Sequence, residues 1–317
     1  MPNKKRKPSI VVIGGGTGTF VVLMGLKEHD VELTSIVTMS DDGGSTGQLR
    51  DDYGVLPPGD VRRSLVALSE SNELLRQLFE YRFENGGVKG HSFGNLVLTA
   101  LQNITGDFDT GLKVASKVLR IRGTVLPVTL DDTRLIAELE DGSVIRGEQN
   151  IDIPKHNSKL HIKKIWLDPP AKANPLCIKA IKNADLIVLA PGDLYTSLVP
   201  NLLVKGISDA IKVSKAKKVY VANLMTKVGE THDFKLSDLL DSLKKYLGCT
   251  PQYILYNTEK PSASRLKKYA AEGSEIIENN VQEGNGIRVI ATPLLRKKGL
   301  IRHSPKRLAE AILKCFD

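Results

Sequence analysis

The chain has 317 residues, of which 41% are hydrophobic, and its formal net charge is +9. This length accommodates one large domain with an insertion, and the ordinary apolar content excludes disordered and fibrous classes. No run of about 18 apolar residues is present, which excludes a membrane-spanning helix. Three scattered cysteines and the absence of a secretory signal predict a reduced, cytoplasmic protein. The basic residues are dispersed without interleaved aromatics, so we expect no nucleic-acid partner.

Short apolar runs that end in glycine or acidic residues predict buried parallel strands at the start of the chain. Residues 10–13 and 33–38 are two such runs, and a helix is expected between them at 20–26. Further helices are expected at 60–69, 73–83, 93–104 and 108–119, the last with Asp107 or its neighbour as its N-cap. The dipeptide Asp141-Gly142 lies between expected strands at 134–139 and 143–148, which predicts an antiparallel hairpin, and another strand is expected at 162–167.

Helices and strands alternate again in the second half of the chain. We expect strands at 186–189, 218–222, 253–256 and 287–291, and helices at 175–183, 202–214, 236–246, 262–271 and 305–315. This pattern predicts an α/β fold with a Rossmann-like, doubly wound, mostly parallel sheet. Residues 1–8 are expected to be a disordered basic tail. Residues 9–317 are expected to form a single nucleotide-binding domain with a small β-hairpin-containing insertion at about 124–170.

The first expected strand is followed by the run Gly14-Gly15-Gly16-Thr17-Gly18. Ligands of open parallel sheets bind beyond the carboxyl ends of the strands. Glycines let the backbone approach a diphosphate closely, and the N-terminus of the next helix offers unpaired amides. The run is not the dinucleotide fingerprint, because its third glycine would fall on Thr19 or Val21, and no Gly-Lys-Ser/Thr triplet closes it. It therefore predicts a diphosphate-binding loop of another kind.

Acidic residues follow the second expected strand and begin a later helix. Asp41 and Asp42 can accept hydrogen bonds from ribose hydroxyls, or hold Mg²⁺ together with Asp60. Turn formation and helix capping are the alternative role of each carboxylate taken alone. Asp42, Asp60 and His91 are the candidates for catalysis, although a loop histidine often has no such role.

Other polar residues are expected at the same edge of the sheet. Asn95 lies early in an apolar helix, where its amide needs a partner. Gly192 with Asp193, and then Asn223, follow two later strands. Tyr269 can stack on a base and Arg302 can pair with a diphosphate, or both can be plain surface residues. Arg62 and Arg63 can likewise reach a phosphate from the first turn of their helix, or be surface arginines.

Six blocks of the sequence together resemble the YvcK branch of the CofD-like proteins, the gluconeogenesis factors of bacteria. The resemblance spans nearly the whole chain. Its blocks are Gly14-Gly15-Gly16-Thr17-Gly18, Met39-Ser40-Asp41-Asp42-Gly43-Gly44-Ser45, Pro57-Pro58-Gly59-Asp60, Gly90-His91 with Gly94-Asn95-Leu96, Ala190-Pro191-Gly192-Asp193, and Asn223-Leu224-Met225-Thr226 with Gly229-Glu230-Thr231.

The resemblance implies a Rossmann-like core, a cytoplasmic location and a role in growth and cell shape on gluconeogenic carbon sources. It implies a UDP-sugar such as UDP-N-acetylglucosamine as ligand, and a homodimer. The CofD relatives are Mg²⁺-dependent 2-phospho-lactate transferases that bind a guanine nucleotide and a deazaflavin. Their metal site has carboxylates resembling Asp41, Asp42 and Asp60. Here Gly43-Gly44-Ser45-Thr46 follows the acidic pair and looks more like the YvcK branch.

Three functions follow from these observations. The leading hypothesis is a nucleotide-sugar-binding regulatory protein that acts on an unidentified protein partner. In it, Gly14 to Gly18 hold the diphosphate, Asp41 the ribose or sugar, Gly192 and Asp193 form the opposite wall, and Tyr269 and Arg302 bind the uridine end and a phosphate. The second is a Mg²⁺-dependent transferase that acts at a nucleotide diphosphate. The third, a protein that binds NAD, follows from the fold class alone.

Overall fold

The structure is a computed structural model that describes residues 6–284 and 286–316. Residues 1–5 of the expected basic tail lie outside the described residues, and residues 6–8 precede the first strand without regular structure. Within the described residues, no helix is both long enough and apolar enough to cross a membrane.

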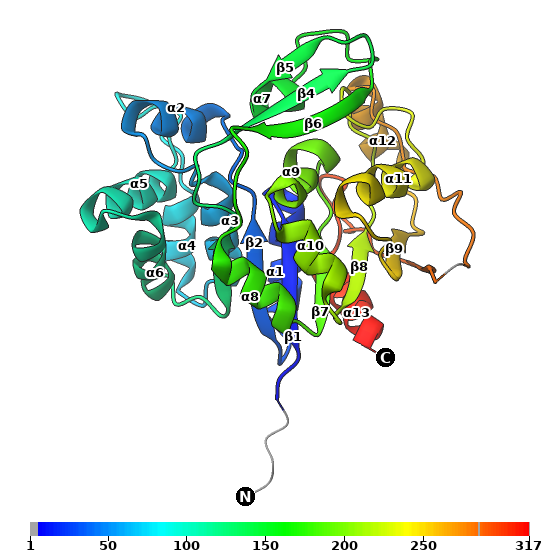
Figure 1. Ribbon diagram of the computed structural model, residues 1–317, viewed down its shortest axis with the longest axis horizontal. Helices are drawn as coiled ribbons and strands as arrows, with labels where there is room; N and C mark the ends of the chain where they lie inside the picture. Colours follow the sequence, from blue (N-terminus) through cyan, green and yellow to red (C-terminus); the bar gives the residue numbers. More distant parts are fainter. Residues whose placement is uncertain (1–5, 285, 317) are drawn as a thin grey trace, which may run out of the picture.

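A seven-stranded parallel sheet forms the centre of the molecule (Figure 1). Its strands are β1 Ser9–Gly14, β2 Glu32–Val37, β3 Thr124–Pro127, β7 Leu186–Leu189, β8 Lys217–Val221, β9 Tyr253–Asn257 and β10 Arg288–Thr292. Their order in the sheet is β10-β9-β8-β7-β1-β2-β3. The chain first proceeds from β1 to β2 and β3, and then returns to β7 on the other side of β1. This reversal opens a crevice at the carboxyl ends of β1 and β7, where ligands of doubly wound sheets bind.

Strand β1 is buried on both faces, as its unbroken β-branched sequence predicts. The side chains of Ile10, Val11, Val12 and Ile13 are fully shielded from solvent. One face of the sheet is covered by α1 Gly16–Leu26, α3 Gly59–Leu68 and α13 Pro305–Leu313, and the other by α8 Pro175–Asn183, α9 Val199–Leu203 and α10 Ile207–Val213 (Figure 1). The predicted α/β, doubly wound fold is therefore confirmed.

The remaining helices extend both ends of the sheet. They are α4 Glu73–Glu80, α5 Phe93–Thr105, α6 Phe108–Val118, α11 Leu236–Leu247 and α12 Ala263–Ala271, and a short 3-10 turn, η2 Lys314–Phe316, ends the described chain. Asp107 caps α6 as expected, because its carboxylate accepts a hydrogen bond of 2.8 Å from the amide of Thr110. Capping residues thus fix the starts of several of these helices.

A small antiparallel sheet forms the insertion and lies over the carboxyl end of the main sheet (Figure 1). It consists of β4 Arg134–Leu139, β5 Val144–Arg146 and β6 Ile162–Asp168, in the order β5-β4-β6, followed along the chain from β5 by the short helix α7 Glu148–Asp152. The hairpin turn has Gly142 at φ 84°, the left-handed conformation that a glycine adopts without strain. The insertion begins later than residue 124, because β3 pairs with β2 in the main sheet.

Several helices differ from the sequence prediction. Helix α1 begins at Gly16, so the last three residues of the glycine run belong to the first turn of the helix. Residues between the acidic block and residue 53 form α2 Gly44–Tyr53, which was not expected. The helix expected at 202–214 is divided into α9 and α10, and a π-helical turn, η1 Leu194–Leu198, precedes them. Glycine at 206, with φ 99°, separates the two helices.

Close packing of α1 against α13 depends on Gly25. A Cβ atom at this position would lie 2.1 Å from the carbonyl oxygen of Pro305, which belongs to rigid helical backbone. Gly25→Ala gains about 1 kcal/mol of helix propensity, but overpacking against backbone costs about 1–3 kcal/mol. We expect a net loss of about 1 kcal/mol in the free energy of unfolding, measured by urea denaturation. Gly87→Ala is the control, because nothing lies within 4 Å of its Cβ position; equal stability of the two variants would contradict the packing argument.

Candidate functional site

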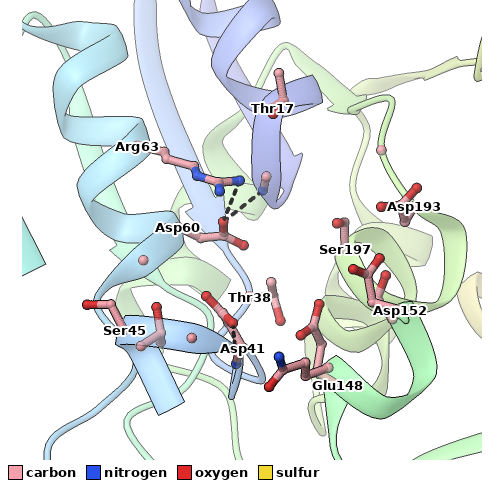
Figure 2. Close-up of a pocket in the computed structure, with 18 of the residues that line it drawn as sticks. Thr17, Thr38, Asp41, Ser45, Asp60, Arg63, Glu148, Asp152, Asp193 and Ser197 are labelled. Carbon is pink, nitrogen blue, oxygen red and sulfur yellow. Dashed lines mark hydrogen bonds and ion pairs between the residues drawn. The ribbon is translucent and has the colours of Figure 1, made fainter. Parts of the chain in front are cut away.

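Two neighbouring cavities open at the carboxyl ends of β1 and β7. The first has a volume of about 470 Å³ and the second about 280 Å³. Both are lined by Thr17, Gly18, Gly192 and Asp193, so they meet at the start of α1. Figure 2 shows the first cavity, with Asp41, Asp60 and Glu148 pointing into it from different elements. The crevice predicted by the strand order is therefore a pair of joined cavities.

The glycine run lets the first turn of α1 come into direct contact with a neighbouring loop at this junction. A Cβ atom on Gly18 would lie 1.6 Å from the carbonyl oxygen of Pro191, so the first turn of α1 touches the loop after β7. Gly16 has φ 61°, which glycine adopts without strain. The amides of the first turn have no partner inside the helix and lie at the positive end of its dipole. This geometry suits an anionic group placed between the cavities.

Gly14 and Gly15 serve the site without lining either cavity. A Cβ atom on Gly14 would lie 2.5 Å from the hydroxyl oxygen of Thr19. A Cβ atom on Gly15 would lie 2.4 Å from a carboxylate oxygen of Asp60. Both glycines therefore leave room for the polar side chains beside them, and the lining itself comes from Gly16, Thr17 and Gly18.

Asp60 caps the N-terminus of α1 from the neighbouring helix α3. Its Oδ1 accepts a hydrogen bond of 2.9 Å from the amide of Gly16, and the guanidinium of Arg63 lies 4.0 Å away (Figure 2). Burial raises the pKa of Asp60, while Arg63 and the Gly16 amide oppose this increase. The carboxylate thus lies in the first cavity beside the amides that an anionic ligand would use.

Asp41 and Glu148 form an acidic wall of the first cavity. Burial, and then the charge of Asp60, raise the pKa of Asp41 to about 6, although its Oδ1 accepts a hydrogen bond of 2.9 Å from Gly43. Burial and the charge of Asp41 raise the pKa of Glu148 to about 10. At neutral pH the wall therefore holds both an ionised carboxylate and a protonated carboxyl group. Such a wall can accept and donate hydrogen bonds to a polyhydroxylated ligand.

Asp42 and His91 lie outside the lining of both cavities. One carboxylate oxygen of Asp42 accepts a hydrogen bond of 2.9 Å from the amide of Gln149, and the other lies 3.9 Å from Arg134, so this residue joins the main sheet to the insertion. His91 is buried, and its Nδ1 is 3.1 Å from the hydroxyl of Ser45. The structure therefore places these two catalytic candidates behind the wall of the first cavity.

Asn95 lines the first cavity and has the partners that its position requires. Its Oδ1 accepts a hydrogen bond of 2.9 Å from Nε of Arg62, and its Nδ2 donates to the hydroxyl of Ser45 at 3.2 Å. The side chain is only 2% exposed. Asn95 thus orients Arg62 at the edge of the cavity.

Gly192 and Asn223 form a reciprocal pair between the loops after β7 and β8. The Gly192 amide donates to the side-chain oxygen of Asn223 at 3.2 Å, and the Asn223 amide nitrogen donates to the Gly192 carbonyl at 2.7 Å. Asn223 lines only the second cavity, whereas Gly192 lines both. This pair fixes the loop against which Gly18 packs.

Tyr269 and Arg302 come together in the second cavity from distant parts of the chain. Tyr269 belongs to α12, and its hydroxyl accepts a hydrogen bond of 3.1 Å from the amide of Ile301, next to Arg302. The side chain of Arg302 is exposed, whereas His303 is buried and burial lowers its pKa to about 4. The cavity thus offers an aromatic ring and a free guanidinium beside a neutral histidine.

A group of three acids supports the junction; Glu230 is buried and the other two are half-buried, and only Asp193 was selected from the sequence. Single carboxylate oxygens of Asp152, Asp193 and Glu230 lie within 4.8 Å of one another. Lys227 pairs with Asp152 at 3.0 Å, and the carboxylate of Glu230 accepts hydrogen bonds from the Tyr195 amide at 2.9 Å and the Thr196 hydroxyl at 2.8 Å.

Burial raises the pKa of Glu230 to about 8. Because both of its carboxylate oxygens accept hydrogen bonds from residues of η1, Glu230 stabilises the loop after β7, whereas Asp193 lines both cavities. Two acidic residues of the site that we did not select had a signal in the sequence: Glu148 ends an expected strand, and Glu230 lies within one of the six blocks.

Comparisons with known proteins agree with this architecture. The family described as 2-phospho-L-lactate transferase CofD matches residues 10–295. A protein of Nostoc sp. is 47% identical, with 98% of this chain and 69% of the relative covered. A protein of Halalkalibacterium halodurans, named gluconeogenesis factor, is 46% identical over 98% of this chain and 97% of its own. The crystal structure of a UPF0052 family member from Bacillus halodurans superposes with a TM-score of 0.92 at 44% identity, covering 97% of this chain and 99% of the other.

The raised pKa of Asp41 predicts that its charge destabilises the folded protein. Above about pH 6 the folded protein ionises Asp41 at a cost, and this cost disappears as the pH falls toward the unfolded value of 3.8. We expect Asp41→Asn to raise the free energy of unfolding at pH 7.5 by about 1–3 kcal/mol. The gain should shrink at pH 4.5, measured by urea denaturation at both values. A variant equally destabilised at both would show that Asp41 stabilises the fold as an ion.

Proposed function

Because this chain belongs to the CofD family, together with relatives named gluconeogenesis factor, we propose that its joined cavities bind a nucleotide-sugar, UDP-N-acetylglucosamine. The observation that carries this proposal is the junction of the two cavities at the first turn of α1. A nucleotide-sugar has a central diphosphate with an uncharged group on either side. One anion-binding junction between two cavities suits that shape.

Each part of the ligand has a complementary wall. The amides of Thr17 and Gly18 would bind the diphosphate, with Arg302 on the side of the second cavity. The ring of Tyr269 would stack on the uracil, and this cavity also offers Asn223 for the ribose. In the first cavity, Asp41 and Asp193 would accept hydrogen bonds from sugar hydroxyls. The Glu148 carboxyl group is available to donate one.

The proposed role is regulatory, and the insertion supports it. Glu148, Gln149 and Asp152 of α7 line the first cavity, so a sugar bound there contacts both the main sheet and the insertion. A ligand that binds one arrangement of these parts more tightly favours that arrangement. A cytoplasmic protein partner, or the second subunit of a homodimer, would read this state during growth and cell-shape maintenance on gluconeogenic carbon sources.

A Mg²⁺-dependent transferase is the second candidate, favoured by the carboxylates in the first cavity. Asp41 and Asp60 offer carboxylate oxygens, the ligands that Mg²⁺ prefers. Their raised pKa values indicate that their negative charges are disfavoured, and a bound cation would stabilise these charges. These two residues would hold the ion, which would neutralise charge on a diphosphate. Asp42 does not fit this set, because its carboxylate binds the Gln149 amide. NAD binding, the third candidate, rests only on the fold.

Isothermal titration calorimetry tests the leading proposal. We expect UDP-N-acetylglucosamine to bind the full chain with a stoichiometry of one per subunit, and NAD to give no heat under the same conditions. Absence of binding at millimolar nucleotide-sugar would refute the proposal. Binding of NAD alone would instead favour the third candidate.

Replacement of Arg302 tests the placement of the ligand in the second cavity. Arg302→Ala removes a charge-assisted hydrogen bond to a phosphate and should weaken binding by about 1.5 kcal/mol or more, roughly tenfold. Arg296→Ala is the matched control, because this exposed arginine lies in the same segment and lines neither cavity. Equal affinities of both variants in calorimetry would remove Arg302 from the site.

The transferase candidate predicts which carboxylate the metal needs. In the presence of UDP-N-acetylglucosamine, Asp60→Asn should weaken Mg²⁺ binding about tenfold or more, whereas Asp42→Asn should change it less than about twofold. The same pair is compared for release of nucleoside monophosphate. Stronger loss in Asp42→Asn would place the metal at the insertion instead. No detectable Mg²⁺ binding by the wild-type protein would dismiss this candidate.

A further inference from the structure

Three arginines line the first cavity, and the proposed nucleotide-sugar site leaves them unused. Arg62 and Arg63 belong to α3, and Arg82 follows α4. Arg63 lies beside Asp60 and Gly16 (Figure 2), and the charges of Arg63 and Arg82 both act on Arg62. We call these three residues the arginine wall.

Arg62 is buried and held by hydrogen bonds, which is uncommon for a cationic side chain. It is only 6% exposed, its Nε donates to Asn95 at 2.9 Å, and its Nη1 donates to the Phe79 carbonyl at 3.3 Å. A Cβ atom on Gly94 would lie 2.7 Å from Cδ of Arg62, so glycine at that position makes room for the arginine stem. These contacts fix the direction of the guanidinium toward the cavity.

The arginine wall has few anionic partners. Within residues 6–284 and 286–316, neither Arg62 nor Arg82 forms an ion pair, and Arg63 has only Asp60 at 4.0 Å. Burial, and then the charges of Arg63 and Arg82, lower the pKa of Arg62, while the charges of Glu80 and Asp60 oppose this decrease. A buried charge without a counter-ion is costly, and a bound anion would remove that cost.

The carboxyl groups of the same cavity do not neutralise the positive charge of the arginine wall. Asp60 is hydrogen-bonded to the Gly16 amide and Asp41 to the Gly43 amide. Within the described residues, the guanidinium of Arg82 donates only to the carbonyl of Gly90. The guanidinium groups therefore keep donors for another molecule.

We propose that Arg62, Arg63 and Arg82 form a second anion site, which binds a small phosphate-type dianion beside the nucleotide-sugar. Guanidinium groups present paired N–H donors that match phosphate oxygens, and Arg82 is exposed and gives the anion access. The buried chain from Arg62 through Asn95 and Ser45 to His91 positions this site. Because the two ligands bind in one cavity, each changes the affinity of the protein for the other.

Phosphorus NMR of the full chain tests this site, with inorganic phosphate as the probe at pH 7.5 and UDP-N-acetylglucosamine at saturation. The wild-type protein should bind phosphate with an affinity in the range of about 1 mM or tighter. Arg82→Ala and Arg62→Met should each weaken phosphate binding about fivefold or more. Arg146→Met is the control, because this exposed arginine pairs with Asp168 and does not line the cavity. Because Arg82 is exposed, its variant is expected to fold even where Arg62→Met does not.

The experiment uses saturating UDP-N-acetylglucosamine and therefore rests on the proposed function. Its possible results distinguish failure of the second anion site from failure of the proposed function. Displacement of phosphate by the nucleotide-sugar would mean that only the junction binds anions, and would overturn the second site. Equal phosphate affinity in the wild-type, Arg82→Ala and Arg146→Met proteins would also overturn it. If UDP-N-acetylglucosamine does not bind, the proposed function fails. The loss of phosphate binding in Arg82→Ala, with none in Arg146→Met, then still supports the arginine wall.

Discussion

The site depends on the contact between Gly18 and the carbonyl of Pro191, which leaves no space for any side chain. This contact brings the first turn of α1 against the loop after β7, and the two cavities meet along it. The reciprocal hydrogen bonds of Asn223 with Gly192 extend the same arrangement to the loop after β8. Three strand ends are thereby held around one anion-binding helix terminus.

Burial disfavours the charged forms of several acidic groups around this junction. Asp41, Asp60, Glu148 and Glu230 all have raised pKa values because burial disfavours their charged forms. A sequence selected only for stability would replace such groups with neutral ones. The presence of Asp41, Asp60 and Glu148 in one cavity, together with three arginines, is typical of a binding site.

Much of the fold could be predicted from the sequence, because its signals are local. Strand β1 is an unbroken β-branched run, and Asp141-Gly142 specifies a hairpin turn. Helix α2 had no such signal, since Leu49 is the only large apolar residue among those it buries. This helix could therefore be identified only from the packing of distant segments in the folded protein, because its sequence has no helical apolar periodicity.

The site was less accessible to sequence reasoning, because proximity there depends on the insertion. Glu148 reaches the cavity only when α7 folds over the main sheet, and no local pattern encodes that position. The same folding leaves Asp42 outside the cavity lining, because its carboxylate accepts a hydrogen bond from the Gln149 amide. The adjacent residues Asp41 and Asp42 therefore face different surroundings, a distinction that sequence spacing does not contain.

The order of the strands also determines when the site can exist during synthesis of the chain. Beside the β1 and β7 pairing, the amide of Ser9 donates to the carboxylate of Asp185, 176 residues away. Contacts of such long range form late and slowly. A nascent chain that has left the ribosome only as far as β3 contains the complete glycine run but nothing against which Gly18 can pack. Ligand-binding competence therefore arises only after the second half of the chain has been translated.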